Sequence, residues 1–444
     1  MTFAGARFRF RFSFVLVVGA SGACFNPSDS NGGSGTDETG STSATSASTV
    51  SQSSTDADST SATPPTSSAD DTTSTTAPTD TTEATLDGTD GSSTGEVSDC
   101  PGGAPTPGDA PYVLTTVIAA QDTNSVDVGD INGDGHLDLI NISRADTSVE
   151  TFFGDGAGGF ASDGVTMLDM GGYPDTVRLG AIADDTVDLF VHMEGPVELW
   201  VVRGDGAGNW PNPQVYTGTY VRAIDLADFN GDDVLDLAYV GASNMEIRLG
   251  EPTETYDAPV LYGENFGNVL RAADISGDGN LDVLTANYGT TELEIYSGAG
   301  DGTFAAQPTL VTGSPISGID VGHLDGDELL DLVLSTEDDL RVFYGERGGG
   351  VSTTPGTIIA GSLGRVRVVD VDADGVEDLV THASSSVEIR FAAGDTTFSD
   401  AVPFACSAYL LGLAIGDLNE DCVPDLVAPL GAGEDLCVLM SDRD

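Results

Sequence analysis

The pattern of hydrophobic and polar positions divides the chain into three parts. One apolar run lies near the N-terminus, from Phe12 to Ala20, and residues 25–110 then carry almost no apolar side chains. From residue 111 to residue 444, short apolar runs return, alternating with polar positions and separated by turns rich in Gly and Asp. Alternation with a period of two is typical of strands that are buried on one face. The pattern therefore predicts an all-β domain over residues 111–444.

A nine-residue acidic loop recurs between these apolar runs. Its first copy, residues 130–138, reads DINGDGHLD and places oxygen-bearing side chains at positions one, three, five and nine. Copies begin at residues 228, 274, 370 and 417, a weaker copy at 323 starts with His, and the copy at 180 has lost positions one and three. The ninth-position aspartates are Asp138, Asp188, Asp236, Asp282, Asp331, Asp378 and Asp425. Seven copies at steps of 46–50 residues indicate a repeat fold.

Each repeat has room for four short strands. In the first repeat, strands are expected over residues 125–131, 137–142, 148–154 and 165–170, with a Gly-rich turn at 155–160. Turns of similar composition recur at 203–210, 297–304 and 393–398. Four short strands per repeat are the content of one blade of a β-propeller, in which radial stacking leaves only short edges. We therefore predict an all-β, seven-bladed β-propeller preceded by a disordered stalk.

The two ends of the domain indicate how the ring closes. Leu439 lies 14 residues after Asp425, as Phe152 lies 14 residues after Asp138, so the seventh repeat ends after its third strand. The apolar stretch 112–119 precedes the first loop at the distance that corresponds to 162–169 in the next repeat. We expect this stretch to complete the last blade beside residues 436–440, which closes the ring non-covalently.

The loops have the composition of structural calcium sites. Ca²⁺ takes about 6–8 oxygen ligands at about 2.3–2.6 Å, which carboxylates, amide oxygens, a backbone carbonyl at position seven and a water can supply. The spacing is similar to that of the EF-hand loop, but here an Asp at position nine leads into a strand. We predict about five Ca²⁺ sites, none in the repeat at 180, and leave the repeat at 323 open. The predicted ligands are Asp130, Asn132, Asp134, His136, Asp138, Asp228, Asn230, Asp232, Val234, Asp236, Asp274, Ser276, Asp278, Asn280, Asp282, Asp325, Asp327, Asp331, Asp370, Asp372, Asp374, Val376, Asp378, Asp417, Asn419, Asp421, Val423 and Asp425.

Motif, period, turn and copy number together resemble the FG-GAP/VCBS repeat family, the seven-bladed propellers related to the integrin α-subunit N-terminal domain. The resemblance covers about residues 111–444. It implies that the short loops bind Ca²⁺ inside the blades, with Asp130, Asn132, Asp134 and Asp138 and their equivalents as ligands. It also implies that other loops of the ring engage protein or glycan ligands.

Charge narrows the classes of partner. The chain has 72 acidic residues against 15 basic ones, all of them arginine, and a net charge of −57. Such a surface repels phosphate backbones and anionic lipid headgroups, so nucleic acid is excluded as a predicted partner. Contact with a membrane is expected only through a lipid on Cys24.

The N-terminal residues 1–24 are predicted to be an export signal. Arg7, Arg9 and Arg11 precede an apolar core that is too short to span a membrane. Residues 21–24 resemble a bacterial lipobox with Ser21 at the usual Leu position, so a surface lipoprotein acylated on Cys24 and plain secretion remain alternatives. Residues 25–110 form a low-complexity stalk, which spans about 50 Å as a flexible chain.

Four further cysteines lie near the predicted closure of the ring. Cys100, Cys406, Cys422 and Cys437 in an exported chain suggest two disulfides, with three possible pairings. They would brace the closing blade covalently, and free thiols remain the alternative.

Three classes of function follow from these features. We expect a non-catalytic binding or adhesion module that presents a rigid disc to a protein or carbohydrate, with a structural surface component and a propeller lyase or hydrolase as alternatives. No catalytic residues are predicted. His192 and His382 occupy equivalent strand positions and are expected to be packed, with a transition-metal pair as the alternative. Trp200 and Trp210 are expected in blade or turn packing, with a glycan platform as the alternative.

Overall fold

The structure is a computed structural model that describes residues 112–120, 123–144, 147–166, 172–183, 186–195, 197–217, 220–241, 244–253, 255–263, 267–287, 289–361, 364–431 and 435–441. The predicted signal and stalk, residues 1–24 and 25–110, lie outside the described residues. The chain divides into two compact units, of which one is Cys24–Thr85. All described residues belong to the other unit.

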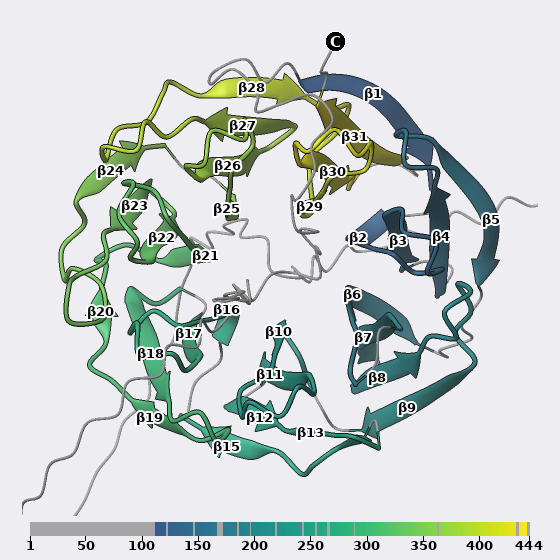
Figure 1. Ribbon diagram of the computed structural model, residues 1–444, viewed down its shortest axis with the longest axis horizontal. Helices are drawn as coiled ribbons and strands as arrows, with labels where there is room; N and C mark the ends of the chain where they lie inside the picture. Colours follow the sequence, from purple (N-terminus) through teal and green to yellow (C-terminus); the bar gives the residue numbers. More distant parts are fainter. Residues whose placement is uncertain are drawn as a thin grey trace, which may run out of the picture. The chain divides into compact units, whose positions relative to one another are not determined.

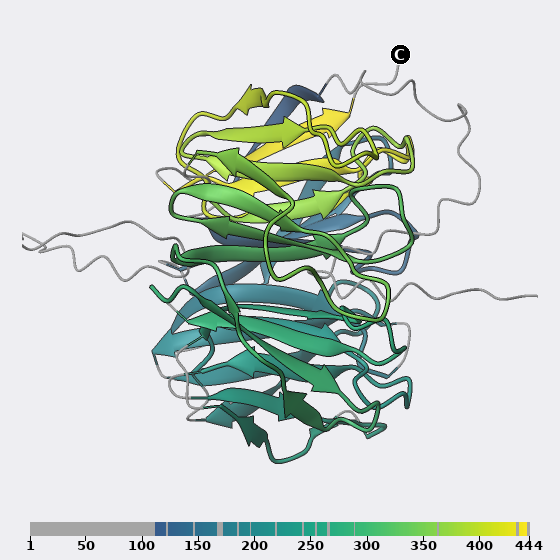
Figure 2. The same ribbon diagram turned by 90° about the vertical axis from the view of Figure 1, so that its left-hand side faces the viewer.

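Seven antiparallel sheets stand around a common axis and form the blades of a propeller (Figure 1). Figure 2 shows the ring edge-on, with the strands running across its thickness. No helix occurs among the described residues, and thus none there is able to cross a membrane. The predicted all-β, seven-bladed propeller is confirmed.

The strands of a blade follow one another outward from the axis. The innermost strands are β2 (Thr123–Gly129), β6 (Tyr173–Gly180), β10 (Ala223–Ala227), β16 (Gly267–Ala273), β21 (Ile316–Gly322), β25 (Val366–Val369) and β29 (Ala414–Gly416). The second strands are β3 (Asp138–Ser143), β7 (Asp188–Gly195), β11 (Asp236–Val240), β17 (Asp282–Asn287), β22 (Asp331–Thr336), β26 (Asp378–Ala383) and β30 (Asp425–Pro429). Every second strand thus begins at a ninth-position aspartate.

The outer half of each blade is more variable. The third strands are β4 (Ser148–Gly154), β8 (Glu198–Arg203), β12 (Met245–Arg248), β18 (Glu292–Gly298), β23 (Asp339–Phe343), β27 (Ser386–Arg390) and β31 (Asp435–Ser441). The outermost strands are β5 (Phe160–Thr166), β9 (Asn212–Thr217), β15 (Val260–Tyr262), β19 (Phe304–Ala306), β24 (Thr357–Ala360), β28 (Val402–Ala405) and β1 (Tyr112–Ala119). Three short strands are added, namely β13 (Gly250–Glu251), β14 (Thr255–Tyr256) and β20 (Leu310–Val311).

The second strands lie at the centre of the hydrophobic core. Leu139, Ile140 and Ile142 of β3 have no exposed surface, and equivalent residues of the other second strands are buried as well. Because both faces of a blade pack against neighbouring blades, these strands are apolar at successive positions rather than at every second one. The same packing explains why the run after each acidic loop was the clearest strand signal in the sequence.

The first strand of the chain closes the ring, as predicted. β1 pairs antiparallel with β31, from Tyr112 opposite Ser441 to Ala119 opposite Asp435. The Tyr112 hydroxyl donates to the Pro424 carbonyl at 2.5 Å, and its ring meets Phe404 of the sixth blade at 5.5 Å between centroids. The first and last segments of the domain therefore belong to one blade.

The predicted fourth strand of the first repeat was wrong in position. The strand lies at Phe160–Thr166 rather than at 165–170, and Tyr112 is equivalent to Phe160 rather than to residue 162. The physical reason is a tight turn, in which the Asp155 amide donates to the Gly159 carbonyl at 3.0 Å and the chain is extended again at Phe160.

A disulfide joins the last two blades. Cys406, which follows β28, is bonded to Cys437 in β31, with a sulfur–sulfur distance of 2.03 Å. Cys437 lies opposite Val117 of β1, so the covalent link is in the blade that closes the ring. Cys422 is disulfide-bonded as well. Cys100 lies outside the described residues.

Candidate metal centres in the blade loops

The ninth-position aspartate ties each blade together. Asp138 is fully buried, its Oδ2 accepts the Ile131 amide at 2.9 Å, and its Oδ1 accepts the Gly154 amide at 2.8 Å. One carboxylate thereby joins the acidic loop to the end of the third strand. The same pair of backbone contacts is made by Asp188, Asp236, Asp282, Asp331, Asp378 and Asp425.

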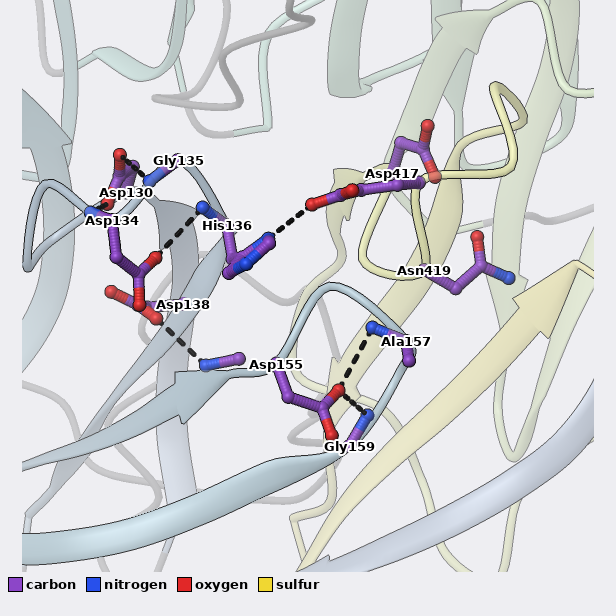
Figure 3. A network of polar contacts seen from close by, with 12 residues as sticks. Asp130, Asp134, Gly135, His136, Asp138, Asp155, Ala157, Gly159, Asp417 and Asn419 are labelled. Atoms are coloured by element: carbon purple, nitrogen blue, oxygen red, sulfur yellow. Dashed lines mark hydrogen bonds and ion pairs between the residues drawn. The ribbon is translucent and has the colours of Figure 1, made fainter. Parts of the chain in front are cut away.

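The carboxylates at positions one and five hold the loop in shape. Asp130 Oδ1 accepts the amides of Gly133 and Asp134 at 2.8 and 3.1 Å, and its Oδ2 accepts that of Gly135 at 2.9 Å (Figure 3). Gly133 and Gly135 have φ of 74° and 90°, a region that glycine enters without a Cβ clash. The predicted need for glycine at positions four and six is therefore confirmed in this loop.

Repeat six brings three carboxylates together at metal spacing. One oxygen from each of Asp370, Asp372 and Asp374 lies within 4.8 Å of the others. Oxygens bound to one Ca²⁺ at about 2.3–2.6 Å are separated by at most about 4.6–5.2 Å. The residues present thus fit a calcium ion. Repeat six has a carboxylate at position three, where repeats one, three, four and seven have Asn or Ser.

The asparagines at position three are turned differently from a metal ligand. Asn132 Nδ2 donates to Asp134 Oδ2 at 3.0 Å, and its Oδ1 accepts the Asp134 amide at 2.9 Å. Asn230 and Asn419 make the same Nδ2 contact, at 3.1 and 3.2 Å. The predicted coordination through Oδ1 requires this amide to rotate away from the backbone.

Burial raises the pKa of the ninth-position aspartates. The pKa is about 6 for Asp138 and Asp236, about 7 for Asp425 and about 8 for Asp378, with burial as the largest cause in each case. The charges of Asp372 and Asp370 add to the effect at Asp378. A bound cation favours the ionised carboxylates and offsets this cost.

A Gly-rich turn of the following blade braces several loops. The contacts run from a turn amide to the carbonyl at loop position two: Gly158 to Leu418 at 3.2 Å, Gly302 to Phe229 at 3.1 Å, and Gly350 to Ile275 at 3.2 Å. The side chains at position two are buried. At the closing seam, His136 Nδ1 also contacts Glu420 Oε1, which links loop one to loop seven (Figure 3).

The family comparison agrees with this repeated geometry. Residues 274–334 and 323–381 match the family described as FG-GAP-like repeat. The chain contains FG-GAP-like repeats. A comparison with curated proteins finds no match. The FG-GAP-like propeller fold suggests a binding module.

Several solved structures share the fold. A chain in the crystal structure of BBS1N in complex with ARL6DN, soaked with mercury, is 12% identical at a TM-score of 0.56, covering 75% of this chain and 97% of that one. In the lead-soaked crystal the values are 14%, 0.54, 75% and 98%. A lectin of Agrocybe aegerita, titled for specific recognition of non-reducing terminal N-acetylglucosamine, is 16% identical at 0.50, covering 65% and 81%. These identities establish a likeness of fold.

In the second FG-GAP-like repeat, an arginine takes the place of the acidic loop. Arg203 Nε lies 3.0 Å from Asp188 Oδ1, and the Asp188 side chain has no exposed surface. Arg203 begins the tripeptide Arg203-Gly204-Asp205, which also occurs in integrin ligands. Here the Gly204 amide donates to Asp188 at 3.0 Å, and Asp205 Oδ1 accepts the Ala207 amide at 2.9 Å, so blade structure accounts for the tripeptide.

In the fifth repeat, a histidine takes over the loop. His323 stands at position one, and its Nδ1 lies 3.1 Å from the carbonyl oxygen of Leu329, so that nitrogen donates to it. Leu329 is position seven, whose carbonyl was the predicted type of metal ligand. Asp325 and Asp327 remain at positions three and five, where Asp327 Oδ1 accepts the Leu329 amide at 2.9 Å.

A second set of buried aspartates was missed by the sequence analysis. Asp127, Asp225 and Asp320 lie on the innermost strands of repeats one, three and five and are 0–3% exposed. Each accepts a backbone amide of the next blade, from Leu179, Ala272 and Val368 respectively, at 2.8 Å. The available signal was an acid three residues before the loop, inside an apolar run.

The predicted histidine and tryptophan positions are mostly buried. His192 and His382 are 3% and 8% exposed, and burial lowers the pKa of each to about 4, so both are neutral near pH 7. Trp210 is 4% exposed, which removes it from the alternative of a glycan platform. Trp200 is partly buried against the core of the second blade, and its indole donates to Glu198 Oε2 at 2.9 Å.

Proposed function

We propose that the protein is an exported, calcium-stabilised β-propeller that serves as a binding module for a protein or carbohydrate ligand and is tethered to the cell envelope by its N-terminal segment. The observation that carries the metal part is the cluster of Asp370, Asp372 and Asp374, whose oxygens have the spacing of a calcium shell. Bound Ca²⁺ supplies positive charge that holds these carboxylates together. The fold carries the binding part.

The ring supports this function through rigidity. Acidic loops lie between the first and second strands of their blades, and neighbouring turns donate to several of them. A cation in such a loop would therefore stiffen two blades at once. The structural role is favoured over direct bridging to a ligand, because a shell filled from nine residues leaves little space for an external oxygen.

A carbohydrate ligand has fold-level support from the Agrocybe aegerita lectin, although the two chains are 16% identical. The choice between carbohydrate and protein is made by experiment. The full chain is screened on a glycan array and in pull-down assays, in Ca²⁺ and after chelation, and bound metal is counted in parallel.

The expected result is specific capture of one ligand class in Ca²⁺, with about five Ca²⁺ per chain, and weaker capture after chelation. The matched variant replaces Asp370, Asp372 and Asp374 by Asn, and it should lose one Ca²⁺ per chain. Measurable turnover of a glycan without stable binding would reverse the proposal in favour of a lyase or hydrolase.

A further inference from the structure

A cavity of about 50 Å³ lies among the innermost strands of five consecutive blades. Its lining comes from β6, β10, β16, β21 and β25 and the residues next to them, which surround the axis in Figure 1. A water needs about 10–15 Å³ by this measure, so the cavity has room for a few waters or one small anion. It is separate from the acidic loops described above.

Arginines are concentrated around this cavity. Five of the 15 basic residues line it, in a chain whose net charge is −57: Arg178, Arg222, Arg271, Arg365 and Arg367. Asp225 is the one acidic residue among the lining residues that the structure describes. A random distribution of so few cations over the ring would not place five of them at one point.

The neighbouring carboxylates balance only part of this charge. Asp320 pairs with Arg271 at 2.8 Å below the cavity. Both oxygens of Asp225 accept backbone amides, from Leu226 at 3.2 Å and Ala272 at 2.8 Å, and burial raises its pKa to about 6. Asp225 is therefore a weaker counter-ion than an exposed aspartate.

The arginines also act on one another. Burial, and then the charge of Arg178, lowers the pKa of Arg365 to about 10. Like charges held in a poorly solvated channel repel, and an anion between them relieves that repulsion. The planar guanidinium fork matches the geometry of carboxylate and phosphate groups, which a point charge does not. Asn268 adds a buried amide whose Oδ1 lacks a hydrogen-bond partner within the described part of the chain.

We propose that this axial cavity binds a small oxyanion group, a carboxylate or a tetrahedral phosphate or sulfate, through Arg178, Arg222, Arg365 and Arg367. The proposal goes beyond the calcium-stabilised binding module and does not depend on it. The acidic surroundings favour a small anion that fits the cavity over an extended polyanion, because the latter would meet the negatively charged surface.

Arg222 offers the safest variant for testing this site. It is exposed and stacks on Tyr220 at 5.3 Å. Arg248 is a matched control, because it stacks on Tyr216 at 5.1 Å but lies in the third strand of the same blade, away from the cavity. Arg222→Gln and Arg248→Gln remove the same charge from similar tyrosine contacts.

The experiment titrates the full, calcium-loaded chain with sodium sulfate or sodium acetate against sodium chloride at equal ionic strength. Sulfate stands in for phosphate, which precipitates with calcium. Binding is followed by calorimetry and by Tm. We expect saturable binding of at least one probe, and a response to sulfate alone or to acetate alone identifies the oxyanion class.

In Arg222→Gln the affinity should fall about tenfold, as for the loss of a charge-assisted hydrogen bond, whereas Arg248→Gln should bind like the unmodified chain. Arg365→Gln should lose binding further. Absence of saturable binding by both probes overturns the proposal. Equal weakening in Arg248→Gln does so as well, because it would show a general charge effect.

Discussion

Repeats two and six bury the same aspartate and neutralise it in different ways. In repeat two, Asp188 faces the guanidinium of Arg203, which the chain itself supplies. In repeat six, Asp378 lies near Asp370 and Asp372, and its pKa rises to about 8. Both aspartates make the same two backbone contacts. The backbone role is therefore common to all blades, while the positive charge is supplied differently.

Repeat five shows a third arrangement. His323 replaces the first aspartate, and its ring donates to the carbonyl that would otherwise face a cation. The comparison teaches that a blade with an incomplete acidic loop is held by a basic side chain. It follows that blades two and five should be indifferent to calcium, and that blades one, three, four, six and seven should depend on it.

Chelation should have the largest effect. Removing Ca²⁺ is expected to lower Tm strongly, because each site loaded at 100-fold above its Kd contributes about 2.7 kcal/mol. Hydrogen exchange should show which blades respond: the amide of Ala392 in blade six should lose protection, and that of Gly204 in blade two should keep it. An unchanged melt in EDTA would contradict the calcium hypothesis.

Loss of the second-blade carboxylate should come next in size. Asp188→Ala leaves Arg203 largely buried without this carboxylate and two amides without their acceptor, and we expect a loss of about 3–5 kcal/mol in the free energy of unfolding. Denaturant unfolding should give the same loss with and without calcium. The control Arg203→Met should be less harmful, because it removes the charge that needs compensation. A calcium-dependent loss in Asp188→Ala would break the distinction between the two blades.

Restoring the fifth loop should convert one class into the other. His323→Asp completes the acidic pattern with Asp325, Asp327 and Asp331, so bound calcium should rise by one ion per chain. At 100-fold saturation this adds about 2.7 kcal/mol. In chelator the variant should be less stable than the parent, because it loses the contact to the Leu329 carbonyl. Unchanged stoichiometry would show that more than position one prevents binding.

A smaller effect is expected at the glycines that donate to the ninth-position aspartate. A Cβ at Gly298 would lie 2.1 Å from the Leu281 carbonyl oxygen, so the strand must shift in Gly298→Ala. We expect a loss of about 1–3 kcal/mol, measured by denaturant unfolding. Ala392→Gly is the matched control, because blade six already accommodates a Cβ at the equivalent position, and it should change stability less.

The smallest effect concerns pH at the seam between blades one and two. Burial raises the pKa of Asp127 to about 6 from its ordinary 3.8. The folded state therefore binds this proton more tightly, so the stabilisation is present below about pH 4 and is lost as pH rises through about 6. Relative to the parent, Asp127→Asn should gain about 1–3 kcal/mol between pH 4.5 and 7, at about 1.4 kcal/mol per pKa unit. A constant difference between the two chains would contradict a protonated Asp127.

Much of the fold could be predicted because its signals are local. The spacing of Asp138 and its equivalents and the apolar runs behind them repeat within each blade, and the loop shape depends on side chains within nine residues. The position of the outermost strand was less predictable, since it depends on how tightly the turn at Asp155 closes. The metal ligands themselves remain predictions.

The sequence by itself determined seven repeats, the acidic loops and the pairing of the first and last segments, because these follow from period and hydrophobic pattern. Only the tertiary structure decided the contacts between residues that no period relates. Arg203 meets Asp188, Asp320 meets both Arg271 and the Val368 amide, and five arginines meet around one axis. These contacts arise because ring closure brings distant residues of different blades together, and a one-dimensional pattern carries no record of that distance.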